Sequence, residues 1–168
     1  MGLNTKSTTT RAVSGSHSVL LRVATRQDCL SVGARLIEEA RLEVQHVVGR
    51  GMSMGDALDD ARLKFPGTLC GYLNGRPEAI FGCYSVGKGR ATVWFLPTAK
   101  VAKYPLLLTR HALNLVAHWK AKHGVLEGSV LAETKAVKWL TLLGFDIYPA
   151  QEAQCADGTV NLYHPFRT

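Results

Sequence analysis

Residues 133 to 145 read Glu-Thr-Lys-Ala-Val-Lys-Trp-Leu-Thr-Leu-Leu-Gly-Phe, and they decide the fold class. The apolar residues recur at offsets of three and four, which places Ala136, Trp139, Leu140 and Leu143 on one face of a short helix. Gly144 follows where a helix needs a left-handed residue to end, and the next side chain can fold back onto the last turn. A strand is expected immediately afterwards.

The same periodicities place the other elements. Strands are predicted at 19–23, 68–73, 77–84, 91–96, 125–131, 146–151 and 159–163, and helices at about 27–47, 54–64 and 105–123. Asn74-Gly75 and Ala156-Asp157-Gly158 are typical of hairpin turns. The predicted order is β-α-α-β-β-β-α-β-α-β-β, a mixed and mostly antiparallel sheet flanked by helices.

Bulk composition indicates one globular domain. The chain has 168 residues, of which 46% are apolar, and no apolar run reaches the ~20 residues of a membrane helix. Residues 1–18 are rich in Ser, Thr and Gly, so a flexible tail is expected there and a single domain from 19 to 168. The four cysteines are widely spaced and form no C-x-x-C pair, which favours reduced thiols over a metal site or disulfides.

The net charge is +7, which favours anionic partners: nucleic acid, an acidic protein or a phosphate-bearing cofactor. The densest basic set is Lys100, Lys103, Arg110, Lys120 and Lys122, without any run of like charges. A generally basic surface explains this pattern equally well. Nucleic-acid binding is the weaker alternative, because no RNP-like motif accompanies the aromatic residues.

Ala136, Trp139, Gly144 and Phe145 match the last helix of the GNAT superfamily of acyl-CoA-dependent N-acyltransferases, whose motif runs Asn-x-x-Ala-x-x-aromatic-Tyr-x-x-x-Gly-Phe. The first strand with its helix entry, at 21–28, and the hairpin at 72–82 resemble that family too. The resemblance covers about 19–166 and implies the GNAT fold. Two functional positions differ: Glu133 replaces the asparagine, and Leu140 replaces a tyrosine that often serves as general acid.

The family's cofactor loop has the form Gln/Arg-x-x-Gly-x-Gly/Ala, and its backbone N–H groups hold the pyrophosphate of acyl-CoA. Residues 94–105 take its place here and contain no glycine, and Pro105 has no N–H to donate. If acyl-CoA binds at all, the resemblance assigns its contacts to Phe95, Leu96, Thr98, Lys100, Lys103 and Tyr104.

Catalytic residues are not identified by any complete motif. Glu127 would serve as a general base if its surroundings raised its pKa towards neutrality, and Ser129 or Tyr148 could orient a substrate or donate a proton. The alternatives are a solvated strand glutamate, a serine bonded to backbone and a packed aromatic ring. Glu133 is expected to begin the last helix at its positive end. A metal site is not expected.

A narrower resemblance lies in the strand Val93-Trp-Phe-Leu-Pro-Thr98 and its glycine-free approach to a basic helix. It is similar to the GNAT-like internal virion protein family of T7-like podoviruses. The resemblance implies a noncatalytic bacteriophage protein, located in the host cytoplasm or packaged in the virion. Its expected partners are phage virion proteins or a host protein, with no cofactor. The alternative is an acetyl-CoA-dependent N-acetyltransferase with an atypical cofactor loop.

Overall fold

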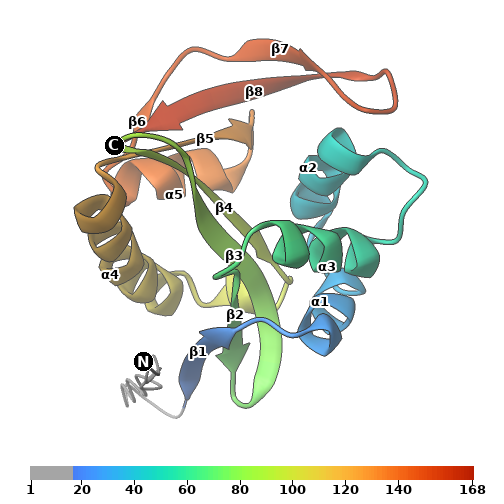
Figure 1. Cartoon of the computed structure of the whole chain (residues 1–168), viewed down its shortest axis with the longest axis vertical. Coiled ribbons are helices and arrows are strands. Elements are labelled where there is room, and N and C mark those ends of the chain that lie inside the picture. Colours follow the sequence, from blue (N-terminus) through green and yellow to red (C-terminus); the bar gives the residue numbers. More distant parts are fainter. Residues whose placement is uncertain (1–16) are drawn as a thin grey trace.

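The computed structural model describes residues 17–168, so most of the predicted tail lies outside the described residues. Within them, eight strands form one sheet in the order β1-β2-β3-β4-β5-β8-β6, with β7 also paired to β8 (Figure 1). In chain order the elements are β1 Val19–Val23, α1 Arg26–Gly33, α2 Glu38–Val48, α3 Met54–Lys64, β2 Leu69–Leu73, β3 Arg76–Gly87, β4 Arg90–Pro97, the 3₁₀-helix η1 Val101–Lys103, α4 Pro105–His123, β5 Val125–Leu131, α5 Lys135–Leu142, β6 Asp146–Ile147, β7 Gln151–Gln154 and β8 Val160–Arg167.

The sheet is mixed and mostly antiparallel, as predicted: among the described strands, β4 and β5 form the one parallel pair. These two strands pair only from Arg90 to Thr92 and from Val125 to Glu127. Beyond that point they separate. The separation opens the middle of the sheet and exposes strand edges there.

Helices cover the two faces of the sheet unequally. Helices α1 to α3 pack on one face around Val32, Leu58 and Ile80, while α4 and α5 pack on the other around Leu126 and Leu140 (Figure 1). Each apolar cluster draws on a different half of the sheet. On the face carrying α1 to α3, helix α2 contacts Leu131 at the end of β5 and Tyr163 of β8.

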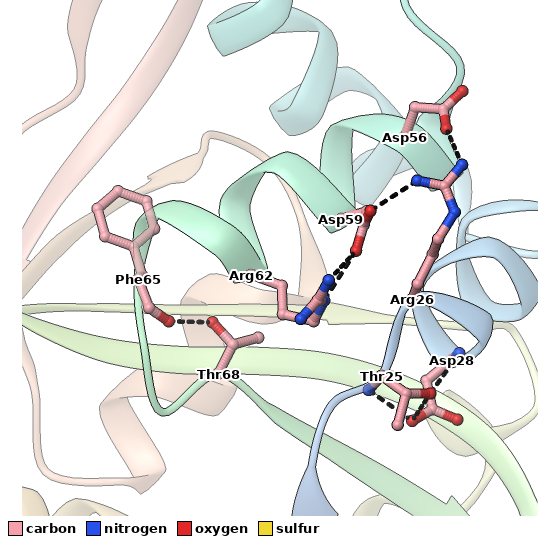
Figure 2. A network of polar contacts seen from close by, with 8 residues as sticks. All are labelled: Thr25, Arg26, Asp28, Asp56, Asp59, Arg62, Phe65 and Thr68. Carbon is pink, nitrogen blue, oxygen red and sulfur yellow. Dashed lines mark hydrogen bonds and ion pairs between the residues drawn. The ribbon is translucent and has the colours of Figure 1, made fainter.

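The Arg26 side chain ties α1 to α3. Arg26 lies between two carboxylates of α3, with its guanidinium 2.9 Å from Asp59 and 3.4 Å from Asp56 (Figure 2). Arg62 reaches the other oxygen of Asp59 at 2.6 Å. Both helices also begin as predicted, because Thr25 and Ser53 accept hydrogen bonds from amides in the first turn.

The end of α5 matches the sequence prediction closely. Gly144 has φ = +86°, its N–H donates to Thr141 at 3.1 Å, and the N–H of Phe145 donates to Leu140 at 3.1 Å. These two bonds make up a Schellman motif, and Phe145 packs in the same buried cluster as Leu140. The segment that decided the fold class therefore has the predicted geometry.

The long helix predicted at about 27–47 is wrong: two helices, α1 and α2, are separated at 34–37. Leu36 forms a β-bridge with Thr98, and the N–H of Ile37 donates to the carbonyl of Pro97 at 3.2 Å. These contacts with the end of β4 outweigh the local helical periodicity, as tertiary contacts often do.

Two further boundaries differ. The strand predicted at 146–151 is split into β6 and β7 around Pro149, and β8 extends four residues beyond the predicted end at 163. Glu133 precedes α5 instead of beginning it, and has φ = +63°. At the other end of the chain, Ser18 exchanges hydrogen bonds with Asn74.

Candidate functional site

A hollow of about 540 Å³ lies over β5 and β8, beside Thr92 and Glu127, the last paired residues of β4 and β5. Its lining includes all three catalytic candidates from the sequence, Glu127, Ser129 and Tyr148. Glu127 and Ser129 face the same side of β5, because side chains alternate along a strand. The structure therefore brings together residues that the sequence could name but not place.

Glu127 is held by two arginines. Arg90 contacts both of its oxygens, at 2.7 and 2.9 Å, and Arg167 approaches at 3.0 Å. Hydrogen bonds from Arg90 and then from Arg167 hold the pKa of Glu127 below its usual range. A general base at neutral pH needs the opposite shift. The arrangement instead joins β4, β5 and β8 at the floor of the hollow.

Ser129 and Tyr148 are exposed to solvent, the latter by 47%. The backbone N–H of Tyr148 donates to Pro165 at 2.9 Å, which fixes the chain between β6 and β7 against β8. Both hydroxyls are thus accessible at the rim of the hollow, where they can hydrogen-bond a bound group.

The segment between β4 and α4 forms its own internal turn. The N–H groups of Ala102, Lys103 and Tyr104 donate to the carbonyls of Thr98, Lys100 and Val101, at 3.4, 3.2 and 3.0 Å. These are the amides that a phosphate-binding loop would present to its ligand. Here a turn of 3₁₀-helix satisfies them.

Two of the six residues assigned to acyl-CoA are buried. Leu96 belongs to the core under α1 to α3, and Thr98 is 1% exposed. The Thr98 hydroxyl donates to the carboxylate of Glu78, which is itself 0% exposed and accepts from Arg35 at 2.7 Å. Thr98 is therefore part of a buried polar network that also fixes the break between α1 and α2.

The other four lie in three places. Phe95 is half-buried, with its ring 5.3 Å from that of Trp139 on α5. Lys100 is exposed, whereas Lys103 and Tyr104 line a second hollow, of about 470 Å³, at the N-terminus of α4. The ring of His17 packs against Tyr104, at 4.6 Å between centroids.

Side chains close the space between α4 and α5. The indole N–H of Trp139 donates to the hydroxyl of Thr109 at 3.0 Å, which joins the two helices. Leu140, at the position of the family's tyrosine, is 9% exposed and lies in the apolar core. It offers no proton donor to the hollow.

Glu43 is a residue of interest that the sequence did not single out. It lies on α2 and accepts a hydrogen bond from the N–H of Leu131, at the end of β5, at 3.4 Å. Burial, with a smaller contribution from the nearby charge of Glu39, raises the pKa of Glu43 to about 7. Its partner lies 88 residues away in the sequence, so no local pattern could have identified it.

Several solved structures share this fold. An acetyltransferase of the GNAT family from Streptococcus pneumoniae is 17% identical and has a TM-score of 0.56, over 89% of this chain and 98% of that chain. Ard1 from Thermoplasma volcanium is 12% identical with a TM-score of 0.64, over 89% and 96%. The structure of yncA from Salmonella typhimurium with its cofactor acetyl-CoA is 17% identical, with a TM-score of 0.57, over 89% and 92%.

These likenesses show that the chain has the GNAT fold, as the sequence predicted, and at such low identities they show the fold alone. No protein-family model matches the sequence, and no curated protein matches it. Among the described residues, no helix has both the length and the apolar character needed to cross a membrane.

Proposed function

We propose that this GNAT-fold protein acts through protein contacts and does not transfer acyl groups. The observation that carries the proposal is the closed turn between β4 and α4. The N–H groups of Ala102, Lys103 and Tyr104 are bonded within that turn, and Pro105 has none. A pyrophosphate held by these amides would have to compete with these bonds.

Two further features support a noncatalytic role. The hollow over β5 and β8 contains a carboxylate whose pKa is lowered by Arg90 and Arg167, which makes Glu127 a poor base. Leu140 supplies a core side chain where related enzymes often have a tyrosine.

The resemblance of residues 93–98 to internal virion proteins of T7-like podoviruses supports a more specific role. On that basis the protein works in a bacteriophage, in virion assembly or against a host protein, without a cofactor. Its place is the host cytoplasm or the virion. Capture of this protein in purified virions, or its absence from them, tests the assembly role.

Acyl-CoA-dependent N-acyl transfer is the second candidate, and Glu43 favours it. With a pKa raised to about 7, this carboxyl can accept a proton near neutral pH, and it lies at the end of β5 beside the separated strands. The hollow that contains Lys103 and Arg110 offers positive charge for a phosphate. The solved yncA protein has acetyl-CoA as its cofactor.

Thermal unfolding with acetyl-CoA separates the two candidates. A ligand at ~100 times its dissociation constant stabilises a fold by about 2.7 kcal/mol, which is several degrees in Tm for a domain of this size. We expect no shift at millimolar acetyl-CoA. A saturable shift that is lost in the Lys103→Ala, Arg110→Ala double variant would contradict the proposal and support the transferase.

A further inference from the structure

The positive charge of this protein is concentrated in one part of the chain. Between Glu78 and Glu127 the sequence contains seven Lys and Arg residues and no Asp or Glu. The whole chain has 20 basic and 13 acidic residues, so the remainder, with 13 of each, is neutral. This basic stretch includes β4, η1 and α4.

One face of α4 combines that charge with exposed leucines. Leu106, Arg110, Leu113, Ala117 and Lys120 follow one another at offsets of four and three, and all five are exposed. We name them the α4 stripe. Spacing of this kind, with a mean of 3.5 residues, is the spacing of a helix seam that packs against another helix.

Helix α4 is also incompletely covered. It is 19 residues long, and none of its residues is fully buried. Leu106 is 87% exposed and Leu113 is 44% exposed. Along an α-helix these two side chains lie ~10 Å apart on the same face. Two leucines at this separation offer an apolar contact surface that residues 17–168, the part of the chain described, leave open.

The positively charged side chains beside these leucines, Arg110 and Lys120, can pair with carboxylates of another molecule. Among the residues that the structure describes, Arg90 pairs with Glu127, whereas no carboxylate lies within ion-pair distance of Arg110 or Lys120. On α4 these two cations are separated by ~15 Å along the axis. A partner with two carboxylates at that separation would meet both.

We propose that the α4 stripe docks an acidic amphipathic helix of another protein. Leucines of the partner would pack against Leu106 and Leu113 around the small Ala117, and its glutamates or aspartates would pair with Arg110 and Lys120. The inference rests on the proposed function, because it names the kind of partner that a protein-contact role requires.

A second copy of this chain fits the stripe poorly. The α1 to α3 region, residues 26–64, has seven acidic and six basic residues, so it is nearly neutral. Its carboxylates Asp56, Asp59 and Asp60 are already paired with arginine or lysine. Nucleic acid fits poorly too, because single-stranded RNA is bound on aromatic side chains and the stripe has leucines.

The test uses a fluorescent synthetic peptide of three heptads with Leu at positions a and d and Glu at positions e and g. Fluorescence anisotropy measures its binding to the full chain, to Arg110→Glu and to Lys88→Glu, which makes the same charge change in the turn between β3 and β4. We expect binding to be about 10-fold weaker for Arg110→Glu, because attraction becomes repulsion, and unchanged within about twofold for Lys88→Glu. Circular dichroism verifies that both variants are folded.

Leu113→Glu tests the apolar contact in the same binding assay. Val160→Glu on β8 is its control, since both side chains are exposed. Failure of the peptide to bind at millimolar concentration overturns the inference, as does equal binding to Arg110→Glu and Lys88→Glu. Tighter binding of a mixed-sequence single-stranded RNA than of the peptide also overturns it. Acetyl-CoA binding measured on the same samples bears on the proposed function alone, so the two failures are distinguishable.

Discussion

Thr98 is bonded twice to Glu78: its backbone N–H donates to the Glu78 carbonyl at 2.9 Å, and its hydroxyl donates to the Glu78 carboxylate. Arg35 completes the network, at 2.7 Å from the same carboxylate and 2.6 Å from the carbonyl of Pro77. The start of the turn before α4 is thereby fixed by the protein's own buried groups.

Replacing Thr98 by valine should reduce the free energy of unfolding by about 1 to 3 kcal/mol, because the buried Glu78 carboxylate loses a donor while the side-chain shape is kept. Urea denaturation measures the change. Thr141→Val is the matched control, since that exposed hydroxyl only donates to Val137 within α5, at 3.2 Å. Equal losses in the two variants would contradict a special role for Thr98.

Gly33→Ala should destabilise the protein by about 2 kcal/mol, because overpacking a close contact forces the backbone apart. A Cβ at Gly33 of α1 would lie 2.4 Å from the backbone nitrogen of Gly55 in α3. Gly51→Ala is the control, since a Cβ there meets nothing within 4 Å. A Gly33→Ala variant with the control's melting temperature would show that the two helices can separate without cost.

Glu133→Asn should stabilise the fold by about 0.5 kcal/mol. Glu133 has φ = +63°, a left-handed conformation that asparagine adopts more readily than glutamate. Glu133→Gln removes the same charge but keeps the strained backbone, so its stability should stay near that of the parent. A gain in Glu133→Gln as large as that in Glu133→Asn would attribute the effect to charge.

Local chemistry was enough to predict much of the fold. Pro105, Gly124 and Gly144 mark the ends of α4 and α5, and the positive φ of Asn74 and Gly75 supports the predicted hairpin. Such residues act on their immediate neighbours, so a sequence pattern carries their effect. The division of the sheet's helices into two faces also follows from the element order.

What sequence could not predict depends on distant contacts. The break between α1 and α2 is caused by residues 97–98, and the raised pKa of Glu43 depends on its burial in the folded protein. Glu127, Ser129 and Tyr148 could be named individually, but only the paired strands β5 and β8 bring them into one hollow. The two arginines on Glu127 come from β4 and β8, and their effect on its pKa has no local signature.

Stability should fall between about pH 4.5 and 7 because of Glu43. Its pKa is raised to about 7 in the folded protein, so in this range the folded state binds more protons than the unfolded state. The slope of stability against pH is therefore negative, and the loss is complete above pH 7, at about 3 kcal/mol at most. Glu43→Gln keeps an acceptor for the Leu131 amide and should remove this slope.

Urea denaturation of the parent and of Glu43→Gln at pH 5, 6, 7 and 8 measures the effect. Glu39→Gln is the control, because it removes a neighbouring charge but retains the buried carboxyl. Parallel stability curves for the parent and Glu43→Gln would contradict the raised pKa, and with it the observation that favours acyl transfer.

The most direct test of the central claim follows the backbone amides of Ala102, Lys103 and Tyr104 by ¹H–¹⁵N NMR while acetyl-CoA is added. Their N–H groups are bonded within the turn. A ligand pyrophosphate held by these three amides would have to break those bonds. We expect these three resonances to stay in place up to millimolar acetyl-CoA. Saturable shifts confined to this turn and the first residues of α4 would contradict the account and identify a working cofactor site.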